Sequence, residues 1–499
     1  MKINILNKRI LTAIGLCGIL LGGAGCKKQL DINQDPNNPS LEQGTPALVF
    51  PAAVAGTIAK TGGDLAIIGG IWSQYFTQSS SANQYTTYDS YNMPTTDDNL
   101  NRVYTVLFTN GLKNYQYVIE QSRAKGDWNY FLLGTVMKAY TAGVLVDLFD
   151  KIPYSQALQG AGNLNPAFDD GYAIYTNLLS SIDSALGQDF SASTNTLPGK
   201  QDLIFGGDMT QWKAFANTLK LKFYLRMVNA HNDVAMAGIQ KLYTSGATFL
   251  DENAAVTNFA DLKNKDNPFY EQNVRSLNAS TNLRASTTFV SWLENNHDPR
   301  IVDYFGVSTP NSINQGDYQN NNATYQSAAV FEQTPTDPVV ILSVAESYFL
   351  QAEARVRYYG GAGAQALYNA GVTAAFADLG EDASSFIAPG GAYAWGAETE
   401  GGTVLTPIAQ IIRQKWASFA YGCHQIEGFF DKNRTGFPAT SSVYSTDASY
   451  VPGRLVISKT TVIGQNLPKR FVYPYDETSR NPNAPQTVVP ITTPVWWGL

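Results

Sequence analysis

Long segments with a helical spacing of apolar residues follow one another along this chain. Within residues 99–126, one helical face collects the apolar side chains of Val103, Val106, Leu107, Leu112, Tyr115, Val118 and Ile119. Gly126 then marks the end of this helix, and the segment 128–150 follows at once as its antiparallel partner. Further patterns occupy 172–186, 208–230, 339–360, 364–380 and 405–422, and Asp208 with Gln211 has capping-box spacing. These patterns predict an all-α fold.

Polar segments rich in Gly, Pro, Ser, Asn and Thr separate the helical patterns, at residues 79–98, 188–207, 262–285, 306–337, 383–403 and 435–470. Long loops in a compact domain usually carry binding or other functional surfaces. No clean repeat of 34 residues is readable, so the period alone does not indicate a repeat architecture. We therefore expect an array of helix pairs that carries an irregular binding face.

The N-terminal residues predict a lipoprotein signal. Basic residues precede a short apolar run from Ile10 to Leu21, and the junction Gly-Ala-Gly then leads into Cys26. We predict a signal peptide over 1–25, a lipidated leader over 26–45 that begins at Cys26, and a single domain over 46–499. The alternative is an ordinary signal peptide with an incidental cysteine. A calcium loop starting at Asp31 is disfavoured, because Pro36 stands where such loops need glycine.

The composition excludes several classes of protein. The net charge is −7 and there is no basic run, so nucleic acid is not an expected partner. After Cys17 and Cys26, only Cys423 remains, which predicts no disulfide and a buried structural thiol. The three histidines have no metal-ligand spacing, and no nucleotide or other cofactor fingerprint is present, so we expect neither metal nor cofactor. No segment after the signal is expected to approach the apolar length of a membrane-spanning helix.

Two polar loops rich in aromatic residues supply the candidate ligand-binding residues. In residues 69–99, Trp72 has helical spacing with its aromatic neighbours, while the tyrosines recur every third residue; the candidates are Trp72, Tyr85, Tyr88 and Tyr91. Exposed rings of this kind would stack on sugars or peptide side chains, and the alternative is that they pack the loop down. A second loop, residues 264–284, adds the candidates Asn267, Tyr270, Arg275, Asn282 and Arg284. Its arginines would bind carboxylates or sugar hydroxyls.

Several segments in order resemble the SusD/RagB family of Bacteroidota outer-membrane lipoproteins. They include the leader GCKKQLDINQDPNNP, LVDLFDKIPYSQAL, GGDMTQWKAFANTLKLKFYLRMVN, VILSVAESYFLQAEARVR, IIRQKWASFAYGCHQIEGFFDKNRTGFP and the C-terminal LPKRFVYPYDETSRNPN. The resemblance implies tetratricopeptide-like helix pairs in a superhelical array with long loop excursions. It implies no position-by-position assignment of binding residues. The Lys27-Lys28-Gln29 stretch after the cysteine departs from relatives that carry acidic residues there.

The resemblance also implies a function. A lipoprotein of this family sits on the outer membrane, captures oligosaccharides or peptides, and delivers them to a SusC-like TonB-dependent barrel without catalysing a reaction. Two other functions stay open from the sequence. One is a surface glycoside hydrolase, since its paired carboxylates would meet only in the fold. The other is a structural envelope protein that holds a partner and has no small ligand.

Overall fold

The computed structural model describes residues 44–499, of which Pro46–Leu499 form one compact unit. The predictions for the signal peptide, for lipidated Cys26, for the tether and for the disfavoured calcium loop fall mainly on residues 1–43, which lie outside the described residues. They stay predictions.

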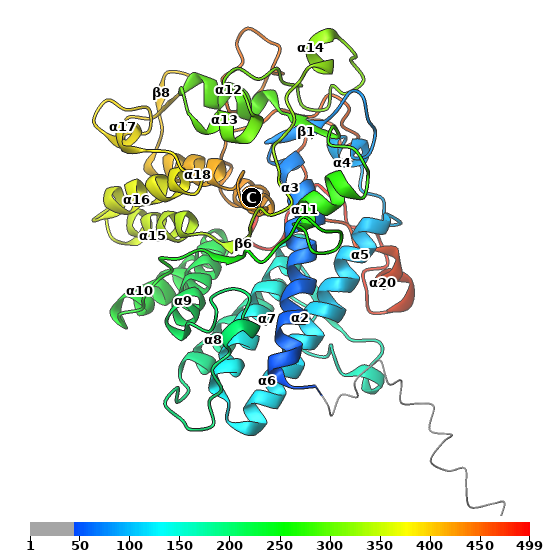
Figure 1. Cartoon of the computed structure of the whole chain (residues 1–499), viewed down its shortest axis with the longest axis vertical. Coiled ribbons are helices and arrows are strands. Elements are labelled where there is room, and N and C mark those ends of the chain that lie inside the picture. Colours follow the sequence, from blue (N-terminus) through cyan, green and yellow to red (C-terminus); the bar gives the residue numbers. More distant parts are fainter. Residues whose placement is uncertain (1–43) are drawn as a thin grey trace, which may run out of the picture. The chain divides into compact units, whose positions relative to one another are not determined.

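The unit is built mainly from helices, so the all-α prediction is confirmed (Figure 1). The longer helices are α2 (Pro46–Ala59), α3 (Leu65–Trp72), α5 (Asp98–Val106), α6 (Lys113–Lys125), α7 (Trp128–Phe149), α8 (Gly171–Leu186), α9 (Met209–Arg226), α10 (Asn232–Thr244), α12 (Thr287–Asn295), α15 (Val344–Tyr358), α16 (Ala364–Ala377), α18 (Pro407–Ser418) and α19 (Ile426–Thr435). Short helices are α4 (Thr86–Asp89), α11 (Pro268–Tyr270), α13 (Arg300–Phe305), α14 (Ala323–Gln326), α17 (Ser384–Ile387) and α20 (Tyr475–Arg480).

The strands of the described chain are short and pair in antiparallel twos. The pairs are β1 (Phe76–Gln78) with β5 (Leu283–Ala285), β2 (Ile152–Pro153) with β3 (Phe168–Asp169), β4 (Ala254–Val256) with β6 (Val339–Leu342), and β7 (Thr399–Glu400) with β8 (Thr403–Val404). Two of the four pairs, β1–β5 and β4–β6, join segments that are distant in sequence, so the strands tie the helical array together and do not form a core sheet.

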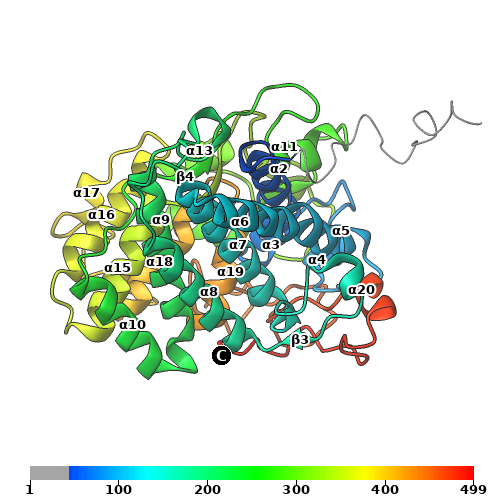
Figure 2. The same cartoon turned by 90° about the horizontal axis from the view of Figure 1, so that it is seen from below.

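Neighbouring helices pack as pairs: α6 against α7, α7 against α8, α9 against α10, and α15 against both α16 and α18. Figure 2 shows these pairs in chain order across the unit, from blue α2 through cyan α6 and α7 and green α9 to yellow α15 and α16. The short helices α4, α12, α13 and α14 lie with β1 at one end of the unit in Figure 1. We call residues 46–72, 98–250 and 343–436 the helix half, and residues 73–97, 251–342 and 437–474 the loop half.

Helix α7 is the central helix of the helix half and corrects one expectation. By length and composition it would suffice to cross a membrane, although no segment after the signal was expected to do so. Its side chains are almost all buried inside the protein, against α6, α8 and α9. A helix that is apolar all round is buried in a large core or in a membrane, and here the protein itself surrounds it.

The ends of the helices follow local sequence signals. Gly126 ends α6 in the left-handed conformation, with φ of 67°, as the sequence predicted. The carboxylate of Asp208 accepts hydrogen bonds from the backbone N–H groups of Thr210 at 2.7 Å and Gln211 at 3.3 Å, which starts α9. The side chain of Gln211 donates to Asp251 at 2.7 Å, so it does not complete the capping box.

Glycines let helices of the helix half approach closely. A Cβ atom at Gly69 of α3 would lie 2.3 Å from the Ile426 Cα at the start of α19, and one at Gly56 of α2 would lie 2.6 Å from the Asn110 Cβ. Real side chains do not tolerate such distances, so these positions require glycine where the backbones cross.

Buried ion pairs join the helices of the helix half. The participating side chains are Lys222, Arg226, Lys415, Arg434, Asp147, Glu346, Glu353, Glu427 and Asp431. Lys222 of α9 lies 3.0 Å from Glu346 of α15 and 2.8 Å from Glu427 of α19. Burial raises the pKa of Glu353, but the neighbouring Arg434 and Arg357 outweigh that effect and hold it at about 2. Charges this deeply buried must all be paired, so this ion network fixes how the helices meet.

In the loop half, neutral side chains also hold together segments that are distant in sequence. The side-chain amide of Gln74 donates to the Val456 carbonyl oxygen at 2.6 Å and accepts from the Val456 N–H at 3.0 Å. Its oxygen also accepts from the Thr288 hydroxyl at 2.8 Å. One buried amide therefore holds three segments of the loop half together.

Candidate ligand-binding surfaces

The structure brings the two predicted loops together. β1 and β5 pair in an antiparallel register that sets Thr77 opposite Arg284 and Gln78 opposite Leu283. The pairing continues beyond the strands, where the Ser79 N–H donates to the Asn282 carbonyl oxygen at 2.8 Å. Residues 69–99 and 264–284 thus form one continuous surface, which we call the loop platform. The sequence indicated both loops but not their contact.

The aromatic candidates of the first loop are buried. Trp72 is 3% exposed, and Tyr85, Tyr88 and Tyr91 are at most 4% exposed. The expectation of exposed stacking rings is therefore corrected, and the alternative, that they pack the loop down, describes the structure. The physical reason is the short helix α4, which anchors this loop through Asp89. The prediction that these residues bind a ligand is untested. It assumed exposed rings, and the structure does not have them.

Individual contacts show how the first loop is held down. The indole N–H of Trp72 donates to the Tyr88 carbonyl oxygen at 3.0 Å, and the Tyr88 hydroxyl donates to Asp97 at 3.0 Å. The buried carboxylate of Asp89 accepts from the Thr77 hydroxyl at 2.7 Å and from the Gln78 N–H at 3.0 Å. Burial raises the pKa of Asp89 to about 6, although these hydrogen bonds favour its charged form.

Two candidates of the second loop shape the backbone of that loop. The side-chain oxygen of Asn267 caps α11 by accepting from the N–H groups of Phe269 at 2.8 Å and Tyr270 at 3.1 Å. Asn282 is buried, and its amide donates to the Asn273 carbonyl oxygen at 3.3 Å. Their hydrogen-bonding groups therefore already have partners within the protein.

The two arginines of the second loop also have protein partners. Arg275 pairs with Asp261 and Asp266, and lies 3.6 Å from Glu271. The hydrogen bonds that Arg275 donates to Asp266 and Asp261 raise its pKa above the usual value. Arg284 donates to the Ala328 carbonyl oxygen. The prediction that both arginines bind ligand carboxylates or hydroxyls stays untested. Tyr270, Arg275 and Arg284 are the partly exposed candidates, and the Arg275 guanidinium lies 5.4 Å from the centre of the Tyr270 ring.

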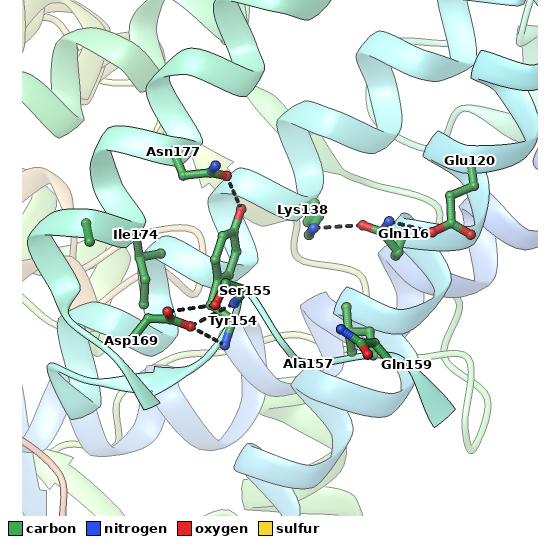
Figure 3. A pocket seen from close by; sticks show the side chains of 12 residues that line it. Gln116, Glu120, Lys138, Tyr154, Ser155, Ala157, Gln159, Asp169, Ile174 and Asn177 are labelled. Atoms are coloured by element: carbon green, nitrogen blue, oxygen red, sulfur yellow. Dashed lines mark hydrogen bonds between the residues drawn. The ribbon is translucent and has the colours of Figure 1, made fainter. Parts of the chain in front are cut away.

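A cavity of 650 Å³ lies elsewhere, among α6, α7, α8 and the segment that follows β2 (Figure 3). A second cavity of 240 Å³ adjoins it and shares five of its lining residues, Gln116, Glu120, Lys138, Tyr154 and Asn177. Ser155, Gln159 and Asp169 are further polar residues around the larger cavity. We call these two cavities together the polar pocket. The volume of the larger cavity is in the range of small-molecule sites, about 300–1,000 Å³.

Two chains of hydrogen bonds line the polar pocket, as Figure 3 shows. On one side the Tyr154 hydroxyl donates to Asn177 at 2.9 Å, and Asp169 accepts from the Tyr154 N–H at 3.1 Å and the Ser155 hydroxyl at 2.8 Å. On the other side Lys138 donates to the Gln116 side-chain oxygen at 2.7 Å, and the Gln116 amide donates to Glu120. Burial lowers the pKa of Lys138 to about 8, against the opposing influence of Glu120.

No residue of the polar pocket is among the ligand-binding candidates predicted from the sequence. The feature that could have indicated the pocket is Lys138, the one basic residue in the otherwise apolar segment of α7. A lysine within such a helix needs a polar environment, which predicts a cavity or a carboxylate beside it. The contribution of Tyr154 and Asp169 depends on the β2–β3 pairing, which no sequence signal revealed.

Cys423 and His424 do not form a reactive pair. Cys423 is buried, and burial raises its pKa to about 12, which confirms the structural thiol expected from the sequence. Burial lowers the pKa of His424 to about 3. Among residues 44–499, no group of three or more His, Cys, Asp and Glu side chains is arranged to hold a metal ion.

Comparison with known proteins identifies the family. Residues 36–457 match the SusD-like family described as "Starch-binding associating with outer membrane". The match covers well over half of the chain, so the chain belongs to this SusD-like family. No curated protein matches the chain.

Solved structures of similar fold agree with this assignment. A chitin-binding protein is 21% identical, with a TM-score of 0.69, and the alignment covers 91% of this chain and 100% of that one. A SusD homologue from Bacteroides uniformis is 18% identical with a TM-score of 0.69, covering 90% and 99%. A chitin-binding SusD homologue from Flavobacterium johnsoniae is 20% identical with a TM-score of 0.68, covering 89% and 98%. The fold of this chain is therefore the helical, tetratricopeptide-like fold of SusD-like proteins.

Proposed function

We propose that this protein is a nutrient-binding lipoprotein of the outer membrane that captures oligosaccharides on the cell surface. The observation that carries the proposal is the family match over residues 36–457, whose description names starch binding and the outer membrane. Two structural relatives are chitin-binding proteins, which also favours a carbohydrate over a peptide. Capture requires binding and release and no bond cleavage, so the proposed function is not enzymatic.

Delivery to a SusC-like TonB-dependent barrel, through which the nutrient crosses the outer membrane, completes the proposal. The physical requirements for such a partner are a rigid body and a tether to the membrane. The ion network within the helix half supplies the rigidity. The predicted lipid on Cys26 would supply the tether, with the protein free to move above the barrel.

The loop platform is the proposed capture surface for long chains. Of its partly exposed candidates, Tyr270 and Arg275 have their ring and guanidinium beside one another. A tyrosine face and a guanidinium edge suit the apolar and hydroxylated sides of a sugar ring. The remaining candidates of the platform would act by holding these two in place.

Affinity electrophoresis of the detergent-solubilised lipoprotein in gels that contain starch or chitin derivatives tests the capture. We expect slower migration in one polysaccharide and partial recovery of mobility in the variant Tyr270→Ala. A reciprocal calorimetric titration with a peptide digest tests the alternative ligand. Heat from peptides and none from any glycan would overturn carbohydrate capture. Release of shorter sugars from the polysaccharide would instead support a glycoside hydrolase.

Extraction of membranes in mild detergent tests the partner. A TonB-dependent barrel that co-purifies in equimolar amount with the lipoprotein would support delivery. The variant Cys26→Ala keeps the folded domain but removes the predicted lipid, and we expect it in the soluble fraction. Its retention in the membrane at the wild-type level would contradict the anchor.

A further inference from the structure

The polar pocket has features of a binding site that the loop platform lacks. It shares no lining residue with the platform, and helices α6, α7 and α8 of the helix half supply most of its wall. Helices position side chains more rigidly than loops do. Helices carry Lys138, Glu120 and Asn177, while Tyr154 and Asp169 belong to the β2–β3 segment, so the pocket joins scaffold helices to one hydrogen-bonded loop.

Internal hydrogen bonds fix the groups around the pocket before any ligand arrives. Asp169 is held by two backbone N–H groups and the Ser155 hydroxyl, at distances between 2.7 and 3.1 Å. Tyr154, whose ring lines both cavities, is held through its hydroxyl by Asn177. A ligand that binds here would meet groups whose conformational entropy has already been lost, which favours affinity.

Much of the hydrogen-bonding capacity of the pocket is still unused. The ammonium group of Lys138 has three N–H donors, and one of them binds Gln116. The side-chain oxygen of Asn177 accepts from Tyr154 at 2.9 Å and from Ser181 at 3.4 Å, and its amide group has two donors of its own. Glu120 uses one oxygen toward Gln116. Donors and acceptors therefore alternate around one cavity.

We propose that the polar pocket is a second carbohydrate site, which takes the end of a neutral oligosaccharide through hydrogen bonds between its hydroxyl groups and Lys138, Asn177 and Glu120. The proposal rests on the function proposed above and adds a separate site to it. A sugar hydroxyl both donates and accepts, which matches a wall where donors and acceptors alternate. The Lys138 ammonium lies over the Tyr154 ring, 5.1 Å from its centre, and the rest of that ring offers an apolar surface for the C–H face of the sugar.

The charges around the pocket select a neutral ligand. The carboxylates of Glu120 and Asp169 are balanced by the cations of Lys138 and Arg123, so the residues around the pocket carry no net charge and favour a neutral ligand. Burial lowers the pKa of Lys138 to about 8, so its ammonium is charged at neutral pH and is partly deprived of water. Hydroxyl groups of a ligand would replace that lost hydration.

Calorimetry with three disaccharides on the detergent-solubilised lipoprotein tests the proposal. The probes are maltose, cellobiose and diacetylchitobiose. The variants are Lys138→Met, which keeps the length of the side chain, and Asn177→Ala, which truncates an exposed side chain and leaves the core intact. Lys213→Met is the matched control, because Lys213 also lies over an aromatic ring, 4.1 Å from the centre of Phe190, and does not line the polar pocket.

We expect one disaccharide to bind, with affinity at least about tenfold weaker in both pocket variants and unchanged in Lys213→Met. A second readout is nuclear magnetic resonance of ¹³C-methylated lysines, where the signal absent from Lys138→Met should shift when the sugar is added. This measurement uses the wild-type protein and stays informative if that variant folds poorly.

The failures of the two proposals can be distinguished. Wild-type disaccharide affinity in both pocket variants, or binding of polysaccharide without any disaccharide, would overturn the pocket site and leave surface capture standing. The absence of binding to carbohydrates of every length would overturn the proposed function, and the pocket site with it.

Discussion

The two halves of the molecule are held together by different chemistry. In the helix half, buried charges such as Lys222, Glu427 and Arg434 connect helices that are far apart in sequence. In the loop half, the fully buried ion pair Arg300–Asp298 joins residues only two positions apart, and separate segments are connected mainly by amides, hydroxyls and tyrosines such as Gln74 and Tyr88. The difference teaches that buried ion pairs fix how regular helices pack against one another. Neutral side chains instead supply hydrogen-bond partners to the N–H and C=O groups of an irregular backbone.

The energetic consequence differs as well. A buried charge that loses its partner costs far more than a neutral group does, because desolvation of an ion is more expensive. The helix half is thus intolerant of single losses. The loop half distributes its stability over many bonds of about 1 kcal/mol each. Three predictions test this comparison, beginning with the largest expected effect.

Replacement of one member of the ion network should be severe. Arg434→Met leaves the carboxylates of Glu353 and Asp431 buried without this cation, so we expect the free energy of unfolding to fall by about 3–5 kcal/mol. Urea unfolding followed by circular dichroism measures it. The control is Arg480→Met on α20, whose exposed pair with Asp476 at 3.5 Å contributes at most about 1 kcal/mol. Equal losses in both variants would contradict the distinction between buried and exposed ion pairs.

A buried carboxylate without a close cation should make stability depend on pH. Burial raises the pKa of Glu398 to about 7, while Arg413 and a hydrogen bond from Gln414 partly oppose that effect. In the unfolded chain the carboxyl titrates near its usual value of about 4.5, so between these values the folded state binds the extra proton. Stability from this group is therefore present at low pH and is lost as the pH rises from about 4.5 to 7.

The variant Glu398→Gln isolates this contribution. We expect the difference in unfolding free energy between variant and wild type to grow in favour of the variant, by at most about 1.4 kcal/mol per pH unit. Urea titrations at pH 5, 6, 7 and 8 (conditions of about one-unit spacing) measure the difference. The comparison cancels other groups, such as His424, whose lowered pKa acts in the opposite direction. A constant difference over this range would argue against a raised pKa.

The smallest effect concerns two tyrosines of the loop platform. The Tyr88 hydroxyl bonds Asp97 and accepts from Asn99 at 3.2 Å, whereas the buried Tyr85 hydroxyl has no hydrogen-bond partner within residues 44–499. We expect Tyr88→Phe to lose about 1 kcal/mol and Tyr85→Phe to lose nothing or to gain slightly. Thermal unfolding of the two variants side by side would measure this. A larger loss in Tyr85→Phe would show that its hydroxyl has a partner.

The sequence predicted those features of the fold that depend on neighbouring residues. Gly126 ends α6 and Asp208 begins α9 because both signals act within one helical turn. The family resemblance extended this to the whole architecture, and the family match confirms it. Burial of Tyr85 and Tyr91 could not be predicted, because three-residue spacing in a polar loop does not show on which side the protein lies.

The candidate sites were predictable only in part. Both loops of the platform were recognised from their composition, but their pairing depends on the β1–β5 register. The polar pocket depends on the contact between Lys138 of α7 and Gln116 of α6. The periodicity of the sequence does not show which faces of the two helices meet. A contact between two polar side chains that are distant in sequence produces no periodic pattern from which it could be predicted.

The amide of Gln74 has a consequence for how the chain folds. Its partner Thr288 lies 214 positions further along the chain, and its partner Val456 lies 382 positions further along. Contacts of such separation close large loops, and they form slowly because the entropy of closure precedes any stabilisation. The helix pairs can assemble from local contacts as they emerge. The segments around Gln74, like the crossing of α3 with α19 in the helix half, are therefore expected to assemble after the local helix pairs, around a side chain that is synthesised among the first.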